Sequence, residues 1–195
     1  MRPRLLACAA LLVLAPLLAA CGNERARPSG LERIGPPTNF ISYSSASGDV
    51  SFGRPSTWTV SSGGFPEVAQ ISSGKAVAAV YSYPRTDLPG DEAGVEASRQ
   101  RLLRSLRERA PGFEVDSSRI TEVDDAPAVE IVGRGRVGGQ RVMTRSVHVY
   151  KGAAEYVVDA YATPEAFERA NTIAFEPLLA TIRLAGLLEG PPGSS

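Results

Sequence analysis

The amino-acid sequence predicts one α+β domain, an antiparallel sheet of about six to eight strands with two main helices packed on it. Two observations predict this class. Short stretches with the alternation and turn residues of β-strands occur in two blocks of four. Each block is followed by a stretch with the spacing of an amphipathic helix. The expected element order is therefore four strands, a helix, four strands and a second helix.

The composition agrees with one globular domain and excludes several functions. Of 195 residues, 43% are hydrophobic and 22% are charged, an ordinary globular mixture. The 21 basic residues equal the 21 acidic ones in number, so the chain has no general attraction to nucleic acid. Cys8 and Cys21 both precede the predicted domain, which therefore has no thiol, and a single histidine makes no metal site. We expect no metal and no cofactor.

The first 20 residues have the organisation of a signal peptide. Arg2 and Arg4 precede an apolar run over residues 5–18, which as a helix would extend about 21 Å and is too short to span a bilayer. The Leu-Ala-Ala-Cys sequence at residues 18–21 then matches the bacterial lipobox. That resemblance implies cleavage before Cys21 and lipidation of its thiol; the alternative is ordinary secretion with cleavage after Ala20. Two or more acyl chains, such as palmitate, would hold the protein stably on a membrane.

The remaining chain divides into three predicted parts. Residues 21–47 contain the lipidated cysteine and a tether rich in Pro, Gly and Ser, and the domain occupies residues 48–185. Some tether residues are bulky enough to dock on the domain, among them Phe40, Ile41 and Tyr43. Residues 186–195 are expected to form a disordered tail.

The first block predicts strands over residues 50–54, 57–61, 68–72 and 76–83. A turn at Pro55-Ser56 would place Trp58 on the second of these strands. The first helix is predicted over residues 91–109 with Asp91 as its N-cap. Its apolar face contains Val95, Leu102, Leu103, Leu106 and Ala110.

The second block predicts strands over residues 113–123, 127–137, 140–151 and 154–162, with a tight hairpin turn at Gly138-Gly139. Thr163 and Pro164 then begin the second helix. Its buried stripe is expected to contain Phe167, Ala170, Ala174, Leu178 and Ile182. Pro177 should kink this helix or restart it.

This order of elements resembles a known group of proteins. The Pro55-to-Trp58 hairpin, the turn around Asp125-Ala126-Pro127 and the closing sequence at residues 178–184 are similar to those of PsbP-like domains, and in particular to the LpqN-type lipoproteins of mycobacteria. Relatives usually have glycine where this chain has Asp125. The resemblance implies a non-enzymatic binding or adaptor module of the cell envelope, and it transfers no functional residues.

One face of the second block carries most of the candidate site residues. If residues 137 and 140, and residues 151 and 154, are paired, Ser146 lies opposite Asp159 and His148 lies on the diagonal. The candidate ligand groove on this face contains Ser146, His148, Tyr150, Asp159 and Tyr161. A catalytic interpretation would make Ser146 the nucleophile and His148 the base, with Asp159 orienting the His148 imidazole. However, a mid-strand serine has no free backbone N–H groups nearby to hold an oxyanion, so we expect no enzyme.

Four arginines, Arg134, Arg136, Arg141 and Arg145, crowd one predicted hairpin. A solvated hairpin tip is the simplest interpretation. The alternative is contact with an acidic partner or an anionic lipid head group. Glu130 lies diagonal to Arg145 and is expected to neutralise it.

The sequence therefore leads to three functional hypotheses. The first is a non-enzymatic binding or adaptor lipoprotein, anchored through Cys21 at the extracytoplasmic face of the cell membrane, with an envelope protein as partner. The second is a carrier or sensor of a small amphiphile, a lipid or glycolipid, in a groove with Arg141 or Arg145 near its mouth. A serine hydrolase is the third.

Overall fold

The structure is a computed structural model that describes residues 39–185. The predicted leader, Cys21, the tether up to residue 38 and the tail over residues 186–195 lie outside the described residues. The elements in chain order are β1 (Phe40–Ser44), β2 (Val50–Pro55), β3 (Thr59–Ser61), β4 (Glu67–Ser73), β5 (Ala76–Pro84), α1 (Glu92–Arg109), β6 (Glu114–Val123), β7 (Ala126–Val137), β8 (Gln140–Lys151), β9 (Ala154–Ala162), α2 (Pro164–Ala170), the π-helix η1 (Asn171–Phe175), α3 (Glu176–Thr181) and β10 (Arg183–Leu184).

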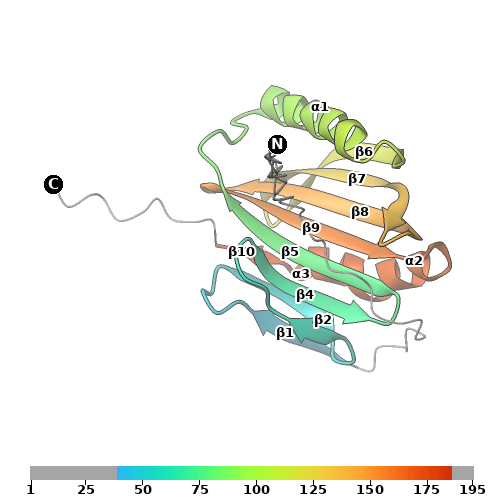
Figure 1. Cartoon of the computed structure of the whole chain (residues 1–195). Coiled ribbons are helices and arrows are strands. Elements are labelled where there is room, and N and C mark those ends of the chain that lie inside the picture. The colour runs from blue at the N-terminus through green and yellow to red at the C-terminus, as the bar shows by residue number, and fades with distance from the viewer. Residues whose placement is uncertain (1–38, 186–195) are drawn as a thin grey trace, which may run out of the picture.

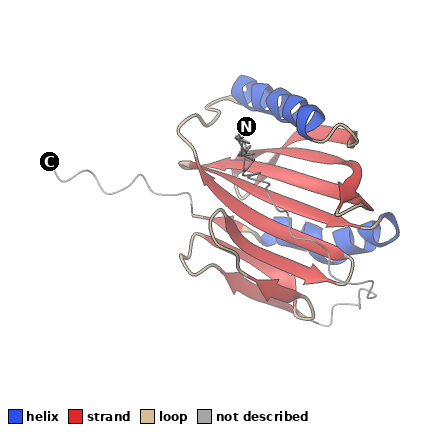
Figure 2. Cartoon of the chain, in the orientation of Figure 1, coloured by secondary structure: helices blue, strands red, loops and turns tan. Residues whose placement is uncertain are grey.

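The strands form two antiparallel sheets (Figure 1). The large sheet has the order β3-β4-β5-β9-β8-β7-β6, and the small sheet has the order β1-β2-β10. Figure 2 shows the helical segments on opposite sides of the large sheet. The predicted fold class, α+β with an antiparallel sheet and two main helical regions, is confirmed.

One face of the large sheet is covered by α2, η1, α3 and the small sheet. The predicted stripe of the closing helix is entirely buried, at 4% exposure or less: Phe167, Ala170, Ala174, Leu178 and Ile182. It packs in one cluster with apolar side chains of β4, β5, β7, β8 and β9. Trp58 meets Phe175 edge to face, with ring centroids 6.0 Å apart. This face holds the main hydrophobic core.

Helix α1 covers part of the other face. Its N-cap is Asp91 as predicted, with Oδ1 accepting a hydrogen bond of 2.8 Å from the Gly94 N–H. Val95 and Leu103 pack against Val129, Ile131 and Tyr150, forming a second and smaller cluster. The two predicted helical regions therefore lie on opposite faces of one sheet.

The predicted register of the second block is confirmed. Val137 pairs with Gln140, and Lys151 pairs with Ala154. Gly138 and Gly139 both have positive φ, at 58° and 83°, which a two-residue turn of this type requires. Consequently, Ser146, His148, Asp159 and their neighbours lie on the face that α1 partly covers.

The predicted hairpin around Pro55-Ser56 is wrong. β2 and β3 belong to different sheets, and Trp58 lies in the turn before β3 rather than on a strand. The indole, only 2% exposed, packs into the main core instead of on a pleated surface. Neighbouring strands in sequence often pair with each other, but here β2 pairs with β1 before it and with the distant β10, and β3 pairs with β4 after it.

A strand also occupies part of the predicted tether. Phe40–Ser44 forms β1, which pairs with β2 from Phe40 opposite Pro55 to Ser44 opposite Ser51. The Tyr43 ring lies 4.9 Å from that of Phe52, which anchors the strand to the core. The folded body therefore begins at least eight residues before position 48.

The closing helix is interrupted just before Pro177. The chain remains helical through residues 164–181, but residues 171–175 adopt the wider π-helical turn. Pro177 stands in the first turn of α3, where proline requires no intrahelical N–H partner. The helix therefore does not stop and restart at Pro177; a π-helical turn joins its two α-helical parts.

Candidate functional site

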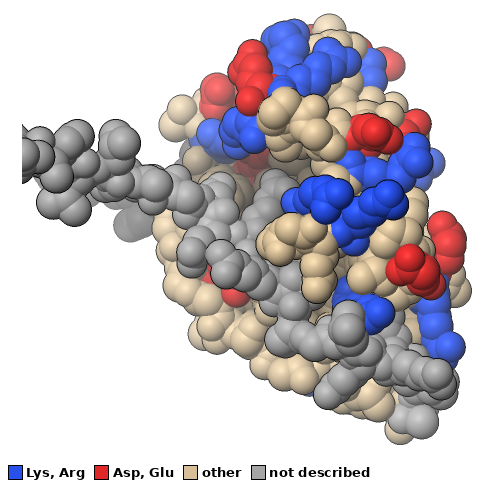
Figure 3. Space-filling model, turned by 45° about the vertical axis from the view of Figure 1, so that its right-hand side comes forward, with Lys and Arg blue, Asp and Glu red and all other residues tan. Residues whose placement is uncertain are grey.

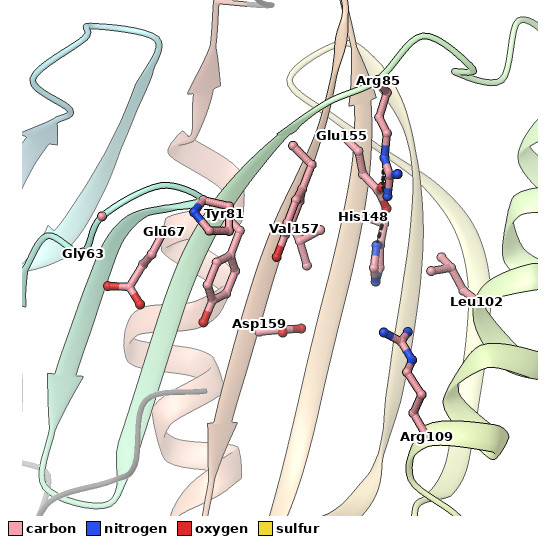
Figure 4. A pocket seen from close by; sticks show the side chains of 13 residues that line it. Gly63, Glu67, Tyr81, Arg85, Leu102, Arg109, His148, Glu155, Val157 and Asp159 are labelled. Atoms are coloured by element: carbon pink, nitrogen blue, oxygen red, sulfur yellow. Dashed lines mark hydrogen bonds and ion pairs between the residues drawn. The ribbon is translucent and has the colours of Figure 1, made fainter. Parts of the chain in front are cut away.

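A hollow lies between α1 and the face of the sheet opposite the main core (Figure 4). Its main part has a volume of about 450 Å³. Two neighbouring recesses of about 310 and 60 Å³ share Leu102 and Arg109 with it. The main part is lined by the loop before β4 and by β4, β5, α1, β8 and β9, through Gly63, Gly64, Pro66, Glu67, Tyr81, Tyr83, Arg85, Leu102, Arg109, His148, Glu155, Val157 and Asp159.

A continuous chain of polar side chains forms the floor of the hollow. The Ser146 hydroxyl donates to Asp159 Oδ1 at 2.5 Å, and Ser146 Oγ lies 3.3 Å from His148 Nε2. His148 Nδ1 is 2.7 Å from Glu155 Oε1. Arg85 donates twice to Glu155 Oε2, at 2.9 and 2.6 Å. The resulting order is Asp159, Ser146, His148, Glu155, Arg85.

Strand geometry explains this arrangement. Side chains alternate between the two faces of a strand, so residues 146, 148 and 150 of β8 share a face with residues 155, 157 and 159 of β9. The register brings Ser146 directly opposite Asp159 and Tyr150 opposite Glu155. On β5, Tyr83 lies opposite Glu155. The β8–β9 hairpin and the long-range pairing of β5 with β9 thus place polar groups from three adjacent strands on one surface.

The charged form of Glu155 is stabilised inside the hollow. Burial disfavours the carboxylate, but hydrogen bonds and charges from His148 and Arg85 outweigh it, so the pKa of Glu155 lies below its usual range. Burial, together with the nearby charge of Glu155, raises the pKa of Tyr150 to about 12. At neutral pH the floor therefore presents a fixed carboxylate and a neutral phenol.

The structure distributes the predicted groove residues over several recesses. His148 and Asp159 line the main hollow, Tyr150 lines the second recess and Ser146 the third. Tyr161, which is 3% exposed, packs instead with Val77 and Val142 in a separate small cluster and lines none of these three recesses.

Several residues of the hollow were not predicted from the sequence. Glu155 could have been found, because it lies four residues before Asp159 on the same strand and so shares its face. Tyr81, Tyr83 and Arg85 come from β5 and the residue after it, and β5 reaches β9 only through long-range pairing. Arg109 comes from the last turn of α1 and has no local signal beyond its charge.

The arginines of the β7–β8 hairpin lie on the opposite face from the hollow. Arg145 is held by Glu130 at 2.6 Å and by Asn171, so it does not stand at the mouth proposed for it. Arg134 pairs with Asp116 at 2.6 Å. Arg136 is exposed and lies opposite Arg141 in the β7–β8 pairing, and its guanidinium donates to the Gly139 carbonyl. The predicted neutralisation of Arg145 by Glu130 is confirmed.

The polar chain differs from a catalytic triad in three respects. Glu155, not Asp159, is the carboxylate at His148 Nδ1. The Ser146 hydroxyl donates its proton to Asp159 and not to the imidazole. β8 is also paired on both sides, with β7 and β9, so the backbone around Ser146 is engaged in the sheet and offers no oxyanion hole.

Within residues 39–185, no three His, Cys, Asp or Glu side chains are grouped closely enough to hold a metal ion. No helix in this range is long and apolar enough to cross a bilayer. Figure 3 shows basic and acidic side chains intermixed around α1.

Solved structures share this architecture although their sequences have diverged widely. The cyanobacterial PsbP protein CyanoP from Synechocystis sp. PCC 6803 superposes with a TM-score of 0.58 and 12% identity, covering 86% of this chain and 98% of its own. The domain has the PsbP-like fold. LpqN of Mycobacterium tuberculosis, described as involved in cell envelope biogenesis, matches with a TM-score of 0.51 and 13% identity over 69% of this chain and 82% of its own.

The Ran-binding protein Mog1p of Saccharomyces cerevisiae is similar to the same extent, with a TM-score of 0.51 and 9% identity over 76% of this chain and 96% of its own. No family model matches the sequence, and no curated protein does so either. These likenesses establish the fold and confirm the PsbP-like part of the predicted resemblance.

Proposed function

We propose that this protein is a lipoprotein anchored through Cys21 at the extracytoplasmic face of the cell membrane, and that its domain is a non-enzymatic binding module of the cell envelope. The lipobox at residues 18–21 supports the anchor. Two proteins of the same fold are described by binding or envelope roles, a Ran-binding protein and LpqN. The binding site in this proposal is the hollow under α1.

The main support for this proposal is the hollow itself, which has a volume of about 450 Å³ and lies on the sheet face away from the main core. Small-molecule sites are typically concave volumes of about 300–1,000 Å³ with a few fixed polar groups. Here Arg85, Glu155 and His148 hold one another in place before any ligand arrives. Preorganised groups lower the entropy cost of binding.

The same contacts argue against catalysis. A serine nucleophile needs a base that accepts its proton, and it needs donors for the developing oxyanion. Ser146 is instead a hydrogen-bond donor to Asp159 in the middle of a doubly paired strand. We therefore assign the polar chain to recognition.

The lining of the hollow supports only a narrower form of the carrier hypothesis, in which the polar part of an amphiphile is bound. An acyl chain would need an enclosed apolar cavity, whereas this hollow is open and lined by three carboxylates, two guanidinium groups and an imidazole. Burying those charges against hydrocarbon would be costly. The lining favours the polar part of a lipid or glycolipid over its tail.

Native mass spectrometry of the mature chain carrying Cys21→Ser, incubated with envelope extract, tests the binding site. We expect a stoichiometric adduct, of an envelope protein or a smaller molecule, that Leu102→Trp abolishes by filling the hollow. Arg104→Trp, on the exposed side of the same helix, is the matched control and should bind normally. No adduct, or equal capture by both variants, would refute the site.

The anchor is tested separately by growing cells with labelled palmitate. The full chain should incorporate the label and sediment with membranes, and Cys21→Ala should do neither. Label that persists in Cys21→Ala would contradict lipidation at this residue.

A further inference from the structure

We infer that the ligand of the hollow under α1 is a neutral carbohydrate, a short saccharide or the sugar part of a larger envelope molecule. This inference rests on the proposed function, because it names the ligand class of the same site. It depends on three features of the lining: mixed charge, a pair of tyrosines and side chains already fixed in position.

The charges around the hollow disfavour a small ion of either sign. Glu67, Glu155 and Asp159 line the same space as Arg85 and Arg109. An anion that approaches the guanidinium groups meets carboxylates, and a cation that approaches the carboxylates meets guanidinium groups. A neutral ligand avoids both repulsions.

A hydroxyl-rich ligand can satisfy both kinds of group. Each hydroxyl donates one hydrogen bond and can accept two, whereas a carboxylate only accepts and a guanidinium only donates. The hollow alternates such groups over a short distance, with Asp159, His148 and Arg109 facing one another in Figure 4. Polar atoms left without partners in such a site would reduce affinity, and a row of hydroxyls leaves few.

Tyr81 and Tyr83 provide the apolar surface that a sugar ring needs. Both project from β5 into the hollow, and their rings lie at 24° to one another with centroids 6.3 Å apart. Sugar rings present C–H groups on their faces and hydroxyls around their edges. A ring lying on this tyrosine pair would direct its hydroxyls toward the Glu67 side and the Asp159–His148 side. Rigid aromatic side chains supply such contact area at low entropic cost.

The hydrogen-bonding groups are held rigidly enough to select one stereochemistry. His148 is fixed between Glu155 and Ser146, and Arg85 is fixed by two bonds to Glu155. Asp159, only 5% exposed, has one oxygen fixed by Ser146. Fixed donors and acceptors distinguish sugars that differ only in the orientation of one hydroxyl.

Saturation-transfer NMR on the mature chain carrying Cys21→Ser tests the inference. The probes are neutral disaccharides built from glucose, galactose or mannose, with a sugar phosphate and phosphocholine as charged comparisons. We expect at least one neutral disaccharide to receive saturation at its ring C–H positions and neither charged probe to do so. Tyr81→Ala and Tyr83→Ala should each weaken binding about tenfold, whereas the corresponding Phe variants should retain it.

Two results would overturn the inference in distinguishable ways. If every disaccharide fails while envelope extract still gives an adduct sensitive to Leu102→Trp, the ligand class is wrong and the proposed binding site stands. If neither sugars nor extract bind, both proposals fail. Sugar binding that is unchanged in Tyr81→Ala and Tyr83→Ala would also refute the site, because the sugar would then bind elsewhere on the protein. Arg104→Ala, on the exposed side of α1, is the surface control and should bind normally.

Discussion

The two faces of the seven-stranded sheet are covered and filled in different ways. The face under α2, η1, α3 and the small sheet is filled with apolar side chains that are almost completely buried. The face under α1 carries a smaller apolar cluster and, beside it, a hollow with a polar floor. A strand supplies both surfaces from alternate residues, so one β8–β9 hairpin contributes Val147 and Val158 to the core and His148 and Asp159 to the hollow. Alternate residues of the same strands thus contribute to the hydrophobic core and to the proposed binding site.

The largest expected difference between the faces is in packing energy. Leu178 is completely buried in the main core, whereas Leu102 is only partly buried at the hollow. Leu178→Ala should lower the free energy of unfolding by about 2–5 kcal/mol, since it leaves a cavity. Leu102→Ala should cost about 1 kcal/mol or less, because solvent already reaches the site. Urea denaturation of both variants measures the difference, and equal losses would break the comparison.

A smaller expected effect concerns the buried carboxylate of Glu130, which lies on the core-side face and pairs with Arg119 and Arg145. Burial of Glu130 opposes its ionisation, but Arg119 and Arg145 outweigh burial and hold its pKa below the usual range. Glu130 therefore contributes stability that is fully present above the ordinary pKa of about 4.3 and is lost as pH falls through the lower folded-state value.

Glu130→Gln removes that contribution, so unfolding of the variant should depend less steeply on pH below about 4.3 than unfolding of the wild type. Thermal unfolding between acidic and neutral pH measures it. Glu122→Gln, at an exposed position of β6, is the control. An unchanged acid profile in Glu130→Gln would mean that the buried pair does not respond to pH as its contacts indicate.

The smallest expected effect is that of Ser146→Ala on the hollow side. Its hydroxyl bonds only within the polar chain, so its loss should change the free energy of unfolding by about 1 kcal/mol. Hydrolysis of an activated ester should remain at the background rate in both proteins. A measurable esterase activity that Ser146→Ala abolishes would overturn the assignment of this face to recognition.

The parts predicted correctly from the sequence depend on local signals. Gly138-Gly139 determines one hairpin turn, and the register then follows by counting, which correctly places Ser146 opposite Asp159. The stripe from Phe167 to Ile182 follows from helical spacing alone. These predictions succeed because residues close in sequence specify them.

The parts that were missed depend on pairing between distant segments. β2 joins β1 and β10 rather than β3, and β10 is 128 or more residues further along the chain than β2. Arg85, which follows β5, and Arg109 reach the hollow only because β5 pairs with β9 and α1 folds back over the sheet. Alternation within a strand shows which residues share a face, but it does not identify the neighbouring strand.

From its strand pairing, we expect the small sheet to determine how the domain responds to mechanical load. β1 and β10, the first and last strands of the described chain, both pair with β2. A pull on the backbone ahead of Asn39 acts first on Phe40, at the open end of the β1–β2 hairpin, where hydrogen bonds would break one after another. A pull beyond Ala185 acts on the short β10. Force from either end therefore acts first on the small sheet, on the core side of the molecule, and the hollow on the opposite face would keep its shape while an edge strand peels away.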